Sequence, residues 1–496
     1  MTSRRLSAIE DPIPTRTNSA PTAAPEAAGL GAWPRLLLMT LSLGMIGGAA
    51  GGPAPGASPP SRAEGPARAA EVVPGSETEA VVVFVTRIIN GDTAPLRSPR
   101  IHLHAPIQLP HQKINKLDVE GRPQRRKDAW GAPVLVYQRE TLAPGSSLVG
   151  RWTARATVRR FRWDWQGPAG GGGPSLSRKE QALGLRDGPV LALDDPVIGS
   201  AAQEAARGRT NTVGVLEGVF DLVMDRLSYD RDGRWQPAPE VLSSGKGSCS
   251  EYSYCFIALC RKNGIPARYV GGIVGRPGAP FHVDRIFHRF PQAHVPGFGW
   301  VDFDPTRTER AQNKRLYFGQ TPGPMLLLAV GDGGDGSLTG TDYLEQHAWD
   351  DRSTRASSLR QAWWFPPCPA KVQTEVKRFR RRLGSVVGPA RAALVREALA
   401  IGHPLVLPWL DDLLYEPGPR VDAARACLEL GGQDELPAIV NCLGRLQDPA
   451  GDRQIGELLN AYTGETFGSN RTRWNEWLKA RTPRTPLPGD RPERAP

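Results

Sequence analysis

The spacing of hydrophobic and polar residues changes several times along the chain. Between residues 76 and 165, runs such as "EAVVVFVTRIIN", "RIHLHAPIQL" and "PVLVYQRETL" have a strand-like pattern, and turn residues such as "NGD" and "APGSS" separate them. Alternation of apolar and polar side chains is typical of strands that bury one face. The segment 76–165 is therefore predicted to form an all-β sandwich domain.

A second pattern covers residues 176–320, after the linker "QGPAGGGGPS". Apolar residues between 196 and 227 recur at helical spacing, and a further helix is predicted from Cys249 to Asn263, where "NGIP" ends it. The strand-like runs "ARYVGGIVG", "VDRIFHRF" and "GWVDFDPT" follow. Helices followed by a sheet indicate an α+β domain.

The C-terminal part, residues 384–480, is predicted to be helical and contains an internal repeat. Leu399 and Gly402 recur as Leu428 and Gly431, an offset of 29 residues, so that "ALAIGHPLVLPWL" lies over "CLELGGQDELPAI". Repeated helical units whose apolar faces need neighbours are typical of solenoids. The unit resembles a short bacterial HEAT repeat, and the predicted HEAT-like domain offers a surface for a protein partner.

Residues 1–75 are predicted to carry targeting information rather than a folded domain. Residues 1–34 are rich in Pro, Ala and Thr, which indicates disorder, and the tail 481–496 is expected to be disordered as well. The run from Arg35 to Gly52 begins with an arginine and ends in small residues, as the core of a signal peptide does. We expect export to the periplasm or the cell exterior, with a single N-terminal membrane anchor as the alternative and a flexible linker up to residue 75.

The net charge of +11 does not change this picture. The basic residues form short separate clusters, such as "RPQRRK" and "KRFRRR", and no aromatic-interleaved stripe accompanies them. This distribution is typical of solvated faces, so no nucleic-acid partner is predicted. Six cysteines in a chain of 496 residues are too few for a disulfide scaffold.

Three cysteines lie close together in "GKGSCSEYSYCFIALC". On a helix, Cys255 lies about 240° round the axis from Cys249. Cys260 lies roughly 16 Å from Cys249 along the axis. These separations exclude a shared metal ion and a disulfide, so Cys255 and Cys260 are predicted to be core residues. The pair His102 and His104 has no obvious third ligand. The sequence therefore predicts neither a metal site nor a cofactor.

Cys249 is predicted to lie in the first turn of its helix, with Ser248 as the N-cap. Free backbone N–H groups and the helix dipole stabilise a thiolate there and lower its pKa. Such a thiolate is a nucleophile when a base lies beside it. The alternative is that Cys249 is a structural residue.

The base and its partner are expected in the downstream segment "FHVDRIFHRFPQAHVPGFGWVDFDPT". The candidates are His282, His288, His294, Asp302 and Asp304. A hairpin centred on Pro296 would place His288 opposite Asp304 on adjacent strands. The carboxylate would then orient the imidazole, which would deprotonate the thiol.

These motifs together resemble the core of the transglutaminase-like superfamily. The resemblance rests on "GKGSC" at a helix start, "NGIPARYVGG" as the strand entry, the histidine strand, and "GFGWVDFDPT". It implies a papain-like or transglutaminase-like α+β core with Cys249 as nucleophile, His288 as general base and acid, and Asp304 as the orienting acid. One departure is His288-Arg289-Phe290, where the family often has His-Ala-Trp.

The resemblance also implies a function. A thiol enzyme of this family would act on peptide or side-chain amides through a thioester, and we expect hydrolysis, as in a cysteine peptidase, rather than cross-linking. Its partner would be a protein or peptide substrate, with no cofactor. The alternative is a non-catalytic scaffold that binds partners through its β and helical-repeat domains.

Overall fold

The computed structural model describes residues 70–165, 175–231, 235–276, 278–309, 315–332, 338–339, 344–350 and 355–481. The expected signal or anchor segment, the linker that follows it and the expected C-terminal tail after residue 481 lie outside these ranges. No helix within the described ranges combines the length and the apolar character that a membrane span needs.

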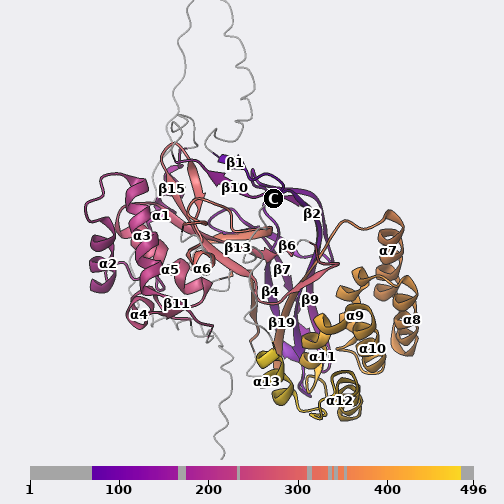
Figure 1. Ribbon diagram of the computed structural model, residues 1–496. Coiled ribbons are helices and arrows are strands. Elements are labelled where there is room, and N and C mark those ends of the chain that lie inside the picture. The colour runs from indigo at the N-terminus through magenta and orange to yellow at the C-terminus, as the bar shows by residue number, and fades with distance from the viewer. Residues whose placement is uncertain are drawn as a thin grey trace, which may run out of the picture. The chain divides into compact units, whose positions relative to one another are not determined.

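The N-terminal region is rich in strands, as predicted, and two antiparallel sheets contain most of them (Figure 1). The five-stranded sheet has the order β14 (His282–Asp284), β19 (Ala356–Phe365), β2 (Thr78–Asn90), β9 (Ser147–Val158) and β5 (Gln112–Val119). The four-stranded sheet has the order β18 (Glu345–Ala348), β4 (Arg100–His104), β7 (Pro133–Gln138) and β6 (Gln124–Lys127). Strands from beyond residue 280 thus complete both sheets, and the sandwich assignment stays a prediction.

Short strand pairs lie outside these two sheets. They are β1 (Ala70–Val72) with β10 (Phe161–Trp163), β3 (Leu96–Arg97) with β8 (Thr141–Leu142), and β11 (Ser228–Tyr229) with β12 (Lys246–Gly247). The β11–β12 pair is parallel and joins the end of one helix to the segment that precedes Cys249.

Strand β2 is buried on both faces, which explains why its sequence is almost continuously apolar. Val82 and Phe84 belong to the core shared with the four-stranded sheet. Val83 and Val85, which point the other way, belong to a second core formed with the C-terminal helices. A strand covered on both sides needs apolar side chains at every position.

The middle of the chain has the α+β arrangement that the sequence predicts. Its helices are α1 (Arg178–Leu185), α2 (Pro196–Ala206), α3 (Thr212–Arg226), α4 (Ala238–Ser244), α5 (Cys249–Lys262) and α6 (Pro305–Thr308). Its antiparallel sheet has the order β16 (Gly299–Asp302), β15 (His288–Val295), β13 (Ala267–Val274) and β17 (Met325–Gly331). The predicted helix from Cys249 is confirmed, and it packs against β15 and β13.

The predicted hairpin forms, but its predicted register is wrong. Strand β16 ends at Asp302, which pairs with Gln292, whereas the expected register places Trp300 opposite Gln292, so the ladder is displaced by two residues. His288 instead pairs with Gly272 of β13 on the other side of β15. Asp304 lies beyond the strand, because Pro305 begins helix α6.

The C-terminal region is helical from Ala370, ahead of the predicted start at residue 384. Its elements are α7 (Ala370–Ser385), η1 (Gly388–Arg391), α8 (Ala392–Ile401), η2 (Pro404–Val406), α9 (Leu407–Leu413), α10 (Arg420–Gly431), η3 (Gly432–Glu435), α11 (Leu436–Cys442), α12 (Pro449–Thr463) and α13 (Arg471–Arg481), where η denotes a 3-10 helix. The order helix, 3-10 turn, helix occurs twice at the offset seen in the sequence. The HEAT-like assignment itself stays a prediction.

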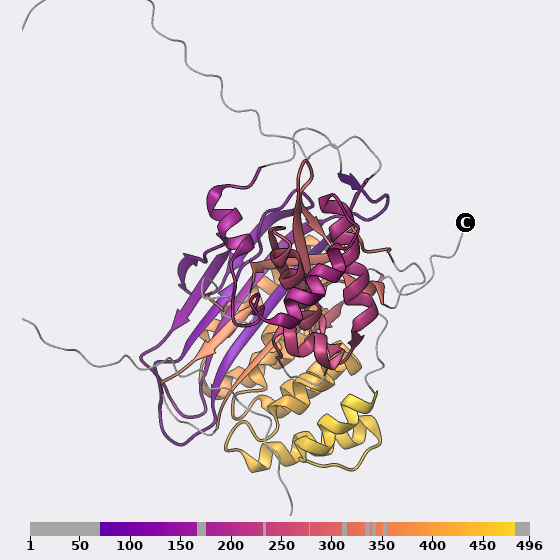
Figure 2. The ribbon, with the colours of Figure 1, turned by 90° about the vertical axis from the view of Figure 1, so that its left-hand side faces the viewer.

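These helices pack against one side of the five-stranded sheet, and α2 to α5 lie on the other side of the molecule (Figure 1). Figure 2 views the protein from the side of α2 to α5, with orange C-terminal helices partly behind the strands and the yellow ones below them. The candidate site described next lies where the start of α5 meets β15 and the start of α6.

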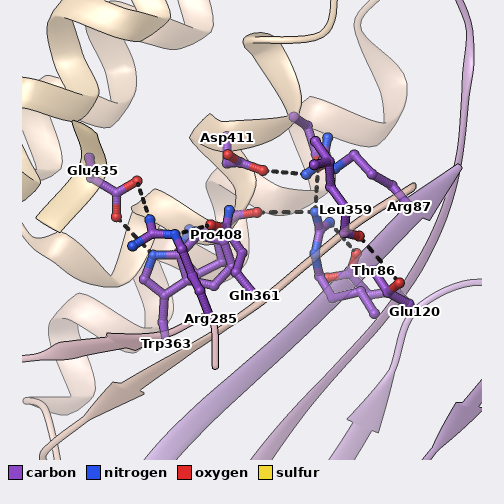
Figure 3. A network of polar contacts seen from close by, with 12 residues as sticks. Thr86, Arg87, Glu120, Arg285, Leu359, Gln361, Trp363, Pro408, Asp411 and Glu435 are labelled. Atoms are coloured by element: carbon purple, nitrogen blue, oxygen red, sulfur yellow. Dashed lines mark hydrogen bonds and ion pairs between the residues drawn. The ribbon is translucent and has the colours of Figure 1, made fainter. Parts of the chain in front are cut away.

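Buried charges join the C-terminal helices to the sheet. Arg87 of β2 pairs with Asp411 and, at 3.0 Å, with Asp412 of α9. Arg151 of β9 lies 2.6 Å from Asp412 and 2.8 Å from Glu120. Figure 3 shows Arg87 pointing toward Asp411, and Glu435 beside Arg285 and Trp363. Because both arginines are buried, each requires its carboxylate partners.

Candidate active site

The start of α5 is built by local interactions. Ser248 is the N-cap, and its backbone N–H donates to the side chain of Glu251 at 2.9 Å. The Ser248 side chain in turn accepts the backbone N–H of Glu251, which completes a capping box, and its hydroxyl also donates to that carboxylate. Gly247 allows the close approach, since a Cβ there would lie 2.6 Å from the Cβ of Glu251.

Cys249 is the first residue of this helix. Its backbone N–H is one of the first-turn donors that have no intrahelical acceptor. The side chain is 9% exposed, so the thiol lies at the edge of the buried core rather than within it. Position and dipole both favour a negative charge at this sulfur.

His288 and Asp304 form a buried pair. Nε2 of His288 lies 2.6 Å from Oδ2 of Asp304, and the two residues are 3% and 0% exposed. The contact occurs despite the displaced ladder, because Asp304 turns back as the N-cap of α6. His288 also hydrogen-bonds with the side chain of Cys249. Since Asp304 occupies Nε2, Nδ1 is the ring nitrogen left for the thiol.

Several donors hold the carboxylate of Asp304. Its Oδ1 accepts the hydroxyl of Thr306 at 2.5 Å and the backbone N–H of Arg307 at 3.2 Å. Nε of Arg307 lies 3.6 Å from Oδ2. The backbone N–H of Asp304 donates to the carbonyl of Tyr317 at 3.0 Å. The orientation of the carboxylate toward His288 is therefore fixed from several sides.

The electrostatics of the three groups favour charge separation. Burial opposes ionisation of Cys249, but the hydrogen bond and charge of His288, with the backbone N–H of Arg289, lower the pKa of the thiol below its ordinary value. Burial likewise opposes the charged form of His288, but Asp304 outweighs it and raises the pKa of the imidazole to about 9. Burial also acts against the Asp304 carboxylate, whose pKa is nevertheless lowered by His288 and Arg307. The arrangement can therefore hold a thiolate beside an imidazolium.

Arg289 brings a further positive charge close to the thiol. Its guanidinium is fully buried, donates to the hydroxyl of Tyr254 and lies 4.3 Å from the centre of the Tyr269 ring. The centre of the Trp235 ring lies 5.3 Å from it. Aromatic faces stabilise a buried cation, so the charge of Arg289 is retained at the position where the family often has alanine.

A short turn sets the direction of His288. The carboxylate of Asp284 accepts the backbone N–H groups of Val274, Ile286 and Phe287 at 2.8, 3.0 and 2.8 Å. Phe287 adopts a left-handed backbone conformation, with φ of 62°, immediately before His288. A non-glycine residue in this conformation is held there by its surroundings.

The other candidates from the sequence lie apart from the thiol. His282 pairs with Trp364 in the β14–β19 ladder, and His294 packs its ring edge-on to Trp300. Asp302 accepts hydrogen bonds from Gln292 and Thr321, at 2.7 and 2.8 Å, instead of contacting His288.

The remaining histidine and cysteine candidates have structural surroundings. His104 lies 3.9 Å from Asp128, and burial lowers the pKa of its imidazole to about 4. His102 lies on the same strand, and within the described ranges no three His, Cys, Asp or Glu side chains are grouped to hold a metal ion. Cys255 and Cys260 are fully buried in the core, as predicted.

Part of the chain that contains the site matches a known sequence family. Residues 199–305 match the model of the transglutaminase-like superfamily. These residues form a transglutaminase-like domain. The transglutaminase-like domain begins within α2 and ends at the start of α6, so it contains Cys249, His288 and Asp304. The chain thus combines a strand-rich N-terminal region, a transglutaminase-like core and C-terminal helices.

Similar solved structures share little sequence with the chain. One is named a "putative cysteine protease" from Cytophaga hutchinsonii; it has 15% identity and a TM-score of 0.41, and the match covers 59% of this chain and 94% of the other. Another is the periplasmic domain of TgpA from Pseudomonas aeruginosa bound to ethylmercury, with 15% identity, a TM-score of 0.26, and coverage of 47% and 91%. The comparison with curated proteins gives no match.

Some features of the site were not predicted from the sequence. The surroundings of Arg289 come from three separate segments, which no local pattern brings together. The role of Asp304 as an N-cap could have been inferred, because an aspartate followed by proline is a typical helix start. The capping role of Glu251 could also have been predicted from the sequence, since Glu251 lies three residues after Ser248.

Proposed function

We propose that this protein is a thiol enzyme that cleaves amide bonds in peptides or in protein side chains. Cys249 is the nucleophile, His288 the general base and acid, and Asp304 the residue that orients and charges the imidazole. The observation that carries this proposal is the buried contact of 2.6 Å between His288 and Asp304, next to a thiol at a helix start. A base held by a third group beside a nucleophile is the arrangement that covalent catalysis requires.

In the first step, Sγ of Cys249 attacks the carbonyl carbon of the amide, and a C–S bond forms. The imidazolium of His288 then gives its proton to the leaving nitrogen, the C–N bond breaks, and a thioester remains on Cys249. The oxyanion that develops would be stabilised by the backbone N–H of Cys249, which points outward from the helix start.

In the second step, neutral His288 takes a proton from water, and the resulting hydroxide attacks the thioester. The C–S bond breaks, the thiolate returns to Cys249, and the product leaves as a carboxylate. Asp304 stays ionised in both steps, which its pKa below the ordinary value supports. We propose water rather than a substrate amine as the acceptor, which makes the enzyme a hydrolase of the cysteine peptidase type.

The substrate would be a protein or peptide, and neither a metal nor a cofactor enters the two steps. We also propose that the enzyme acts outside the cytoplasm, either exported or held by one N-terminal anchor. This part of the proposal rests on the apolar run from Arg35 to Gly52. N-terminal sequencing of the protein from a secreting host tests it, because processing after that run is expected.

The catalytic proposal is tested with a library of fluorogenic peptide amides. Cys249→Ser is expected to abolish hydrolysis, whereas Cys368→Ser, which changes a half-buried thiol outside the domain, should leave it unchanged. Turnover by Cys249→Ser at the wild-type rate would contradict the assignment. Repeating the assay with excess cadaverine, read by mass spectrometry, decides the acceptor, since products that are mainly amine adducts would contradict hydrolysis.

A further inference from the structure

A groove of about 840 Å³ lies between the five-stranded sheet and the C-terminal helices. Its walls are the end of β5 with the turn that follows, at residues 116–121, and helix α7. Thr153 and Arg155 of β9 form part of the floor, and Trp409 of α9 lies near one end. None of the candidate catalytic residues lines it.

The groove follows the edge of a strand. Successive side chains of a strand point to opposite faces, so a run of consecutive residues can line one groove only where the strand edge itself is exposed to it. β5 is the last strand in the order of its sheet, and no described strand pairs with its outer edge along residues 116–119.

Backbone hydrogen-bonding groups point into the groove along this edge. The N–H of Glu120 donates inward, to the carbonyl of Arg151, at 3.0 Å. In an antiparallel ladder, residues alternate between those that bond to the partner strand and those that face away from it. The N–H and C=O groups of Leu117 and Val119 therefore face outward, as a template for one more strand.

The lining of the groove has an excess of positive charge. It contains five basic and two acidic side chains. Asp118 pairs with Lys116 at 3.2 Å, and Glu120 pairs with Arg380 at 2.7 Å. The other three basic side chains are exposed and form no ion pair with any part of the chain that the structure describes. They are Arg155, Lys377 and Arg381.

The spacing of these charges fits an extended chain. Lys377 and Arg381 are four residues apart on α7, which places them about 6 Å apart along the helix axis. Alternate side chains of an extended peptide are about 6.6–6.8 Å apart. A peptide with acidic residues at alternate positions could therefore face both basic side chains at once.

We propose that this groove binds an extended acidic peptide of another protein, which adds as a strand to the edge of β5 and places its carboxylates against Arg155, Lys377 and Arg381. Main-chain hydrogen bonds and pairing of opposite charges are the two components of such recognition. The chain's own N-terminal and C-terminal segments contain more Arg than Asp and Glu, so they do not fit as the occupant. This proposal goes beyond the proposed enzymatic function and does not depend on it.

The test is fluorescence anisotropy of the full chain with a fluorescein-labelled octapeptide in which Glu and Val alternate. Binding is expected, and the triple variant Arg155→Glu, Lys377→Glu, Arg381→Glu should weaken it at least about tenfold. The single variant Lys377→Glu should weaken it less. Arg378→Glu is the matched control, because this exposed residue of α7 does not line the groove and its change should leave the affinity unaltered.

Two further probes separate strand addition from charge alone. The same octapeptide with N-methylated valines can no longer donate all its main-chain hydrogen bonds and is expected to bind at least about tenfold more weakly. Equal binding of both peptides would overturn strand addition. Tight binding of a sulfated oligosaccharide without binding of the octapeptide would overturn the choice of occupant.

A last variant separates this proposal from the enzymatic one. Cys249→Ala should bind the octapeptide as the wild type does. Loss of binding in this variant would place the peptide at the thiol and overturn the groove proposal. Loss of activity in it, with binding retained, supports both proposals separately.

Discussion

The carboxylate of Asp304 divides its two oxygen atoms between His288 and the start of helix α6. Oδ2 lies 2.6 Å from Nε2 of the imidazole, whereas Oδ1 accepts hydrogen bonds from Thr306 and from the backbone N–H of Arg307. The side chain of Asp304 thus both caps helix α6 and stabilises the protonated imidazole of His288. Changes at this position are expected to affect both stability and reactivity, and the two effects can be measured separately.

Asp304→Asn should raise the pH at which the Cys249 thiol ionises. The charge of Asp304 raises the pKa of His288, and the imidazolium in turn lowers the pKa of Cys249. Without that charge the imidazolium is less stable, so the thiolate forms at higher pH. The measurement is the rate of iodoacetamide alkylation at Cys249 against pH. Amide hydrolysis should fall about 10²- to 10⁴-fold.

Asp302→Asn is the control for that change. Asp302 is also buried in the same segment, but its partners are Gln292 and Thr321. Its alkylation profile should match the wild type even if its melting temperature falls. An unchanged profile in Asp304→Asn would contradict the coupling between the carboxylate and the thiol.

Gly247→Ala should weaken the start of α5. The added Cβ would lie 2.6 Å from the Cβ of Glu251, so the capping carboxylate must move away from Ser248. Loss of the cap costs about 1–2 kcal/mol in the free energy of unfolding. Urea unfolding followed by circular dichroism measures it. Gly199→Ala in α2 is the matched change, because open space surrounds that position and alanine favours the helix there.

The stability of the protein should depend on the ionisation of Glu435. Burial, which outweighs the nearby charge of Arg285, raises the pKa of this carboxyl from 4.5 to about 7. The folded state therefore binds the proton more tightly than the unfolded chain. The contribution of Glu435 to stability is complete below pH 4.5 and is lost as the pH rises through 7. The expected size is about 3 kcal/mol.

Glu435→Gln checks this sign. The amide oxygen can still accept the hydrogen bond of 3.0 Å from the indole of Trp363. Thermal unfolding between pH 5 and pH 8 should show the wild type losing stability relative to the variant as the pH rises. A gap between the two proteins that stays constant over this range would contradict the raised pKa.

Arg151→Met should destabilise the contact between the sheet and α9. Removing this buried guanidinium takes one cation from Asp412 and one from Glu120, which keep Arg87 at 3.0 Å and Arg380 at 2.7 Å. Because each carboxylate keeps a partner, the cost should lie at the lower end of the about 3–5 kcal/mol expected for a fully orphaned buried charge. Arg159→Ala, which breaks an exposed pair with Glu77, should cost less than about 1 kcal/mol in the same urea titration. Similar losses for both variants would contradict a special role of the buried network.

Sequence patterns were sufficient where the structure depends on neighbouring residues. The helix start at Ser248 and Cys249 is such a case, because its cap, glycine and acidic partner all lie within five residues. The contact between His288 and Asp304 was predicted by placing them opposite each other in a hairpin. The observed ladder is displaced by an even number of residues, so the side chains keep the predicted face of the sheet. Capping of α6 by Asp304 then brings the carboxylate back to the imidazole.

Pairings across long stretches of chain could not be read in the same way. The strand character of β19 is visible in "QAWWF", but nothing local says that it pairs with β2. The burial of Arg289 among Tyr254, Tyr269 and Trp235 is likewise a product of tertiary packing. Periodicity indicates which face of an element is buried, whereas partner choice depends on the assembled fold.

The pairing of β19 with β2 has a consequence for synthesis of the chain. Strand β2 is central in its sheet, and one of its two neighbours ends at Phe365. During translation, almost three hundred further residues must therefore be synthesised before β19 can cover this edge of β2. Its apolar run "AVVVFV" is meanwhile an uncovered template for pairing with other chains. We expect a protein truncated after the transglutaminase-like domain to aggregate, and a chaperone to be most useful to this chain before residue 365 has emerged.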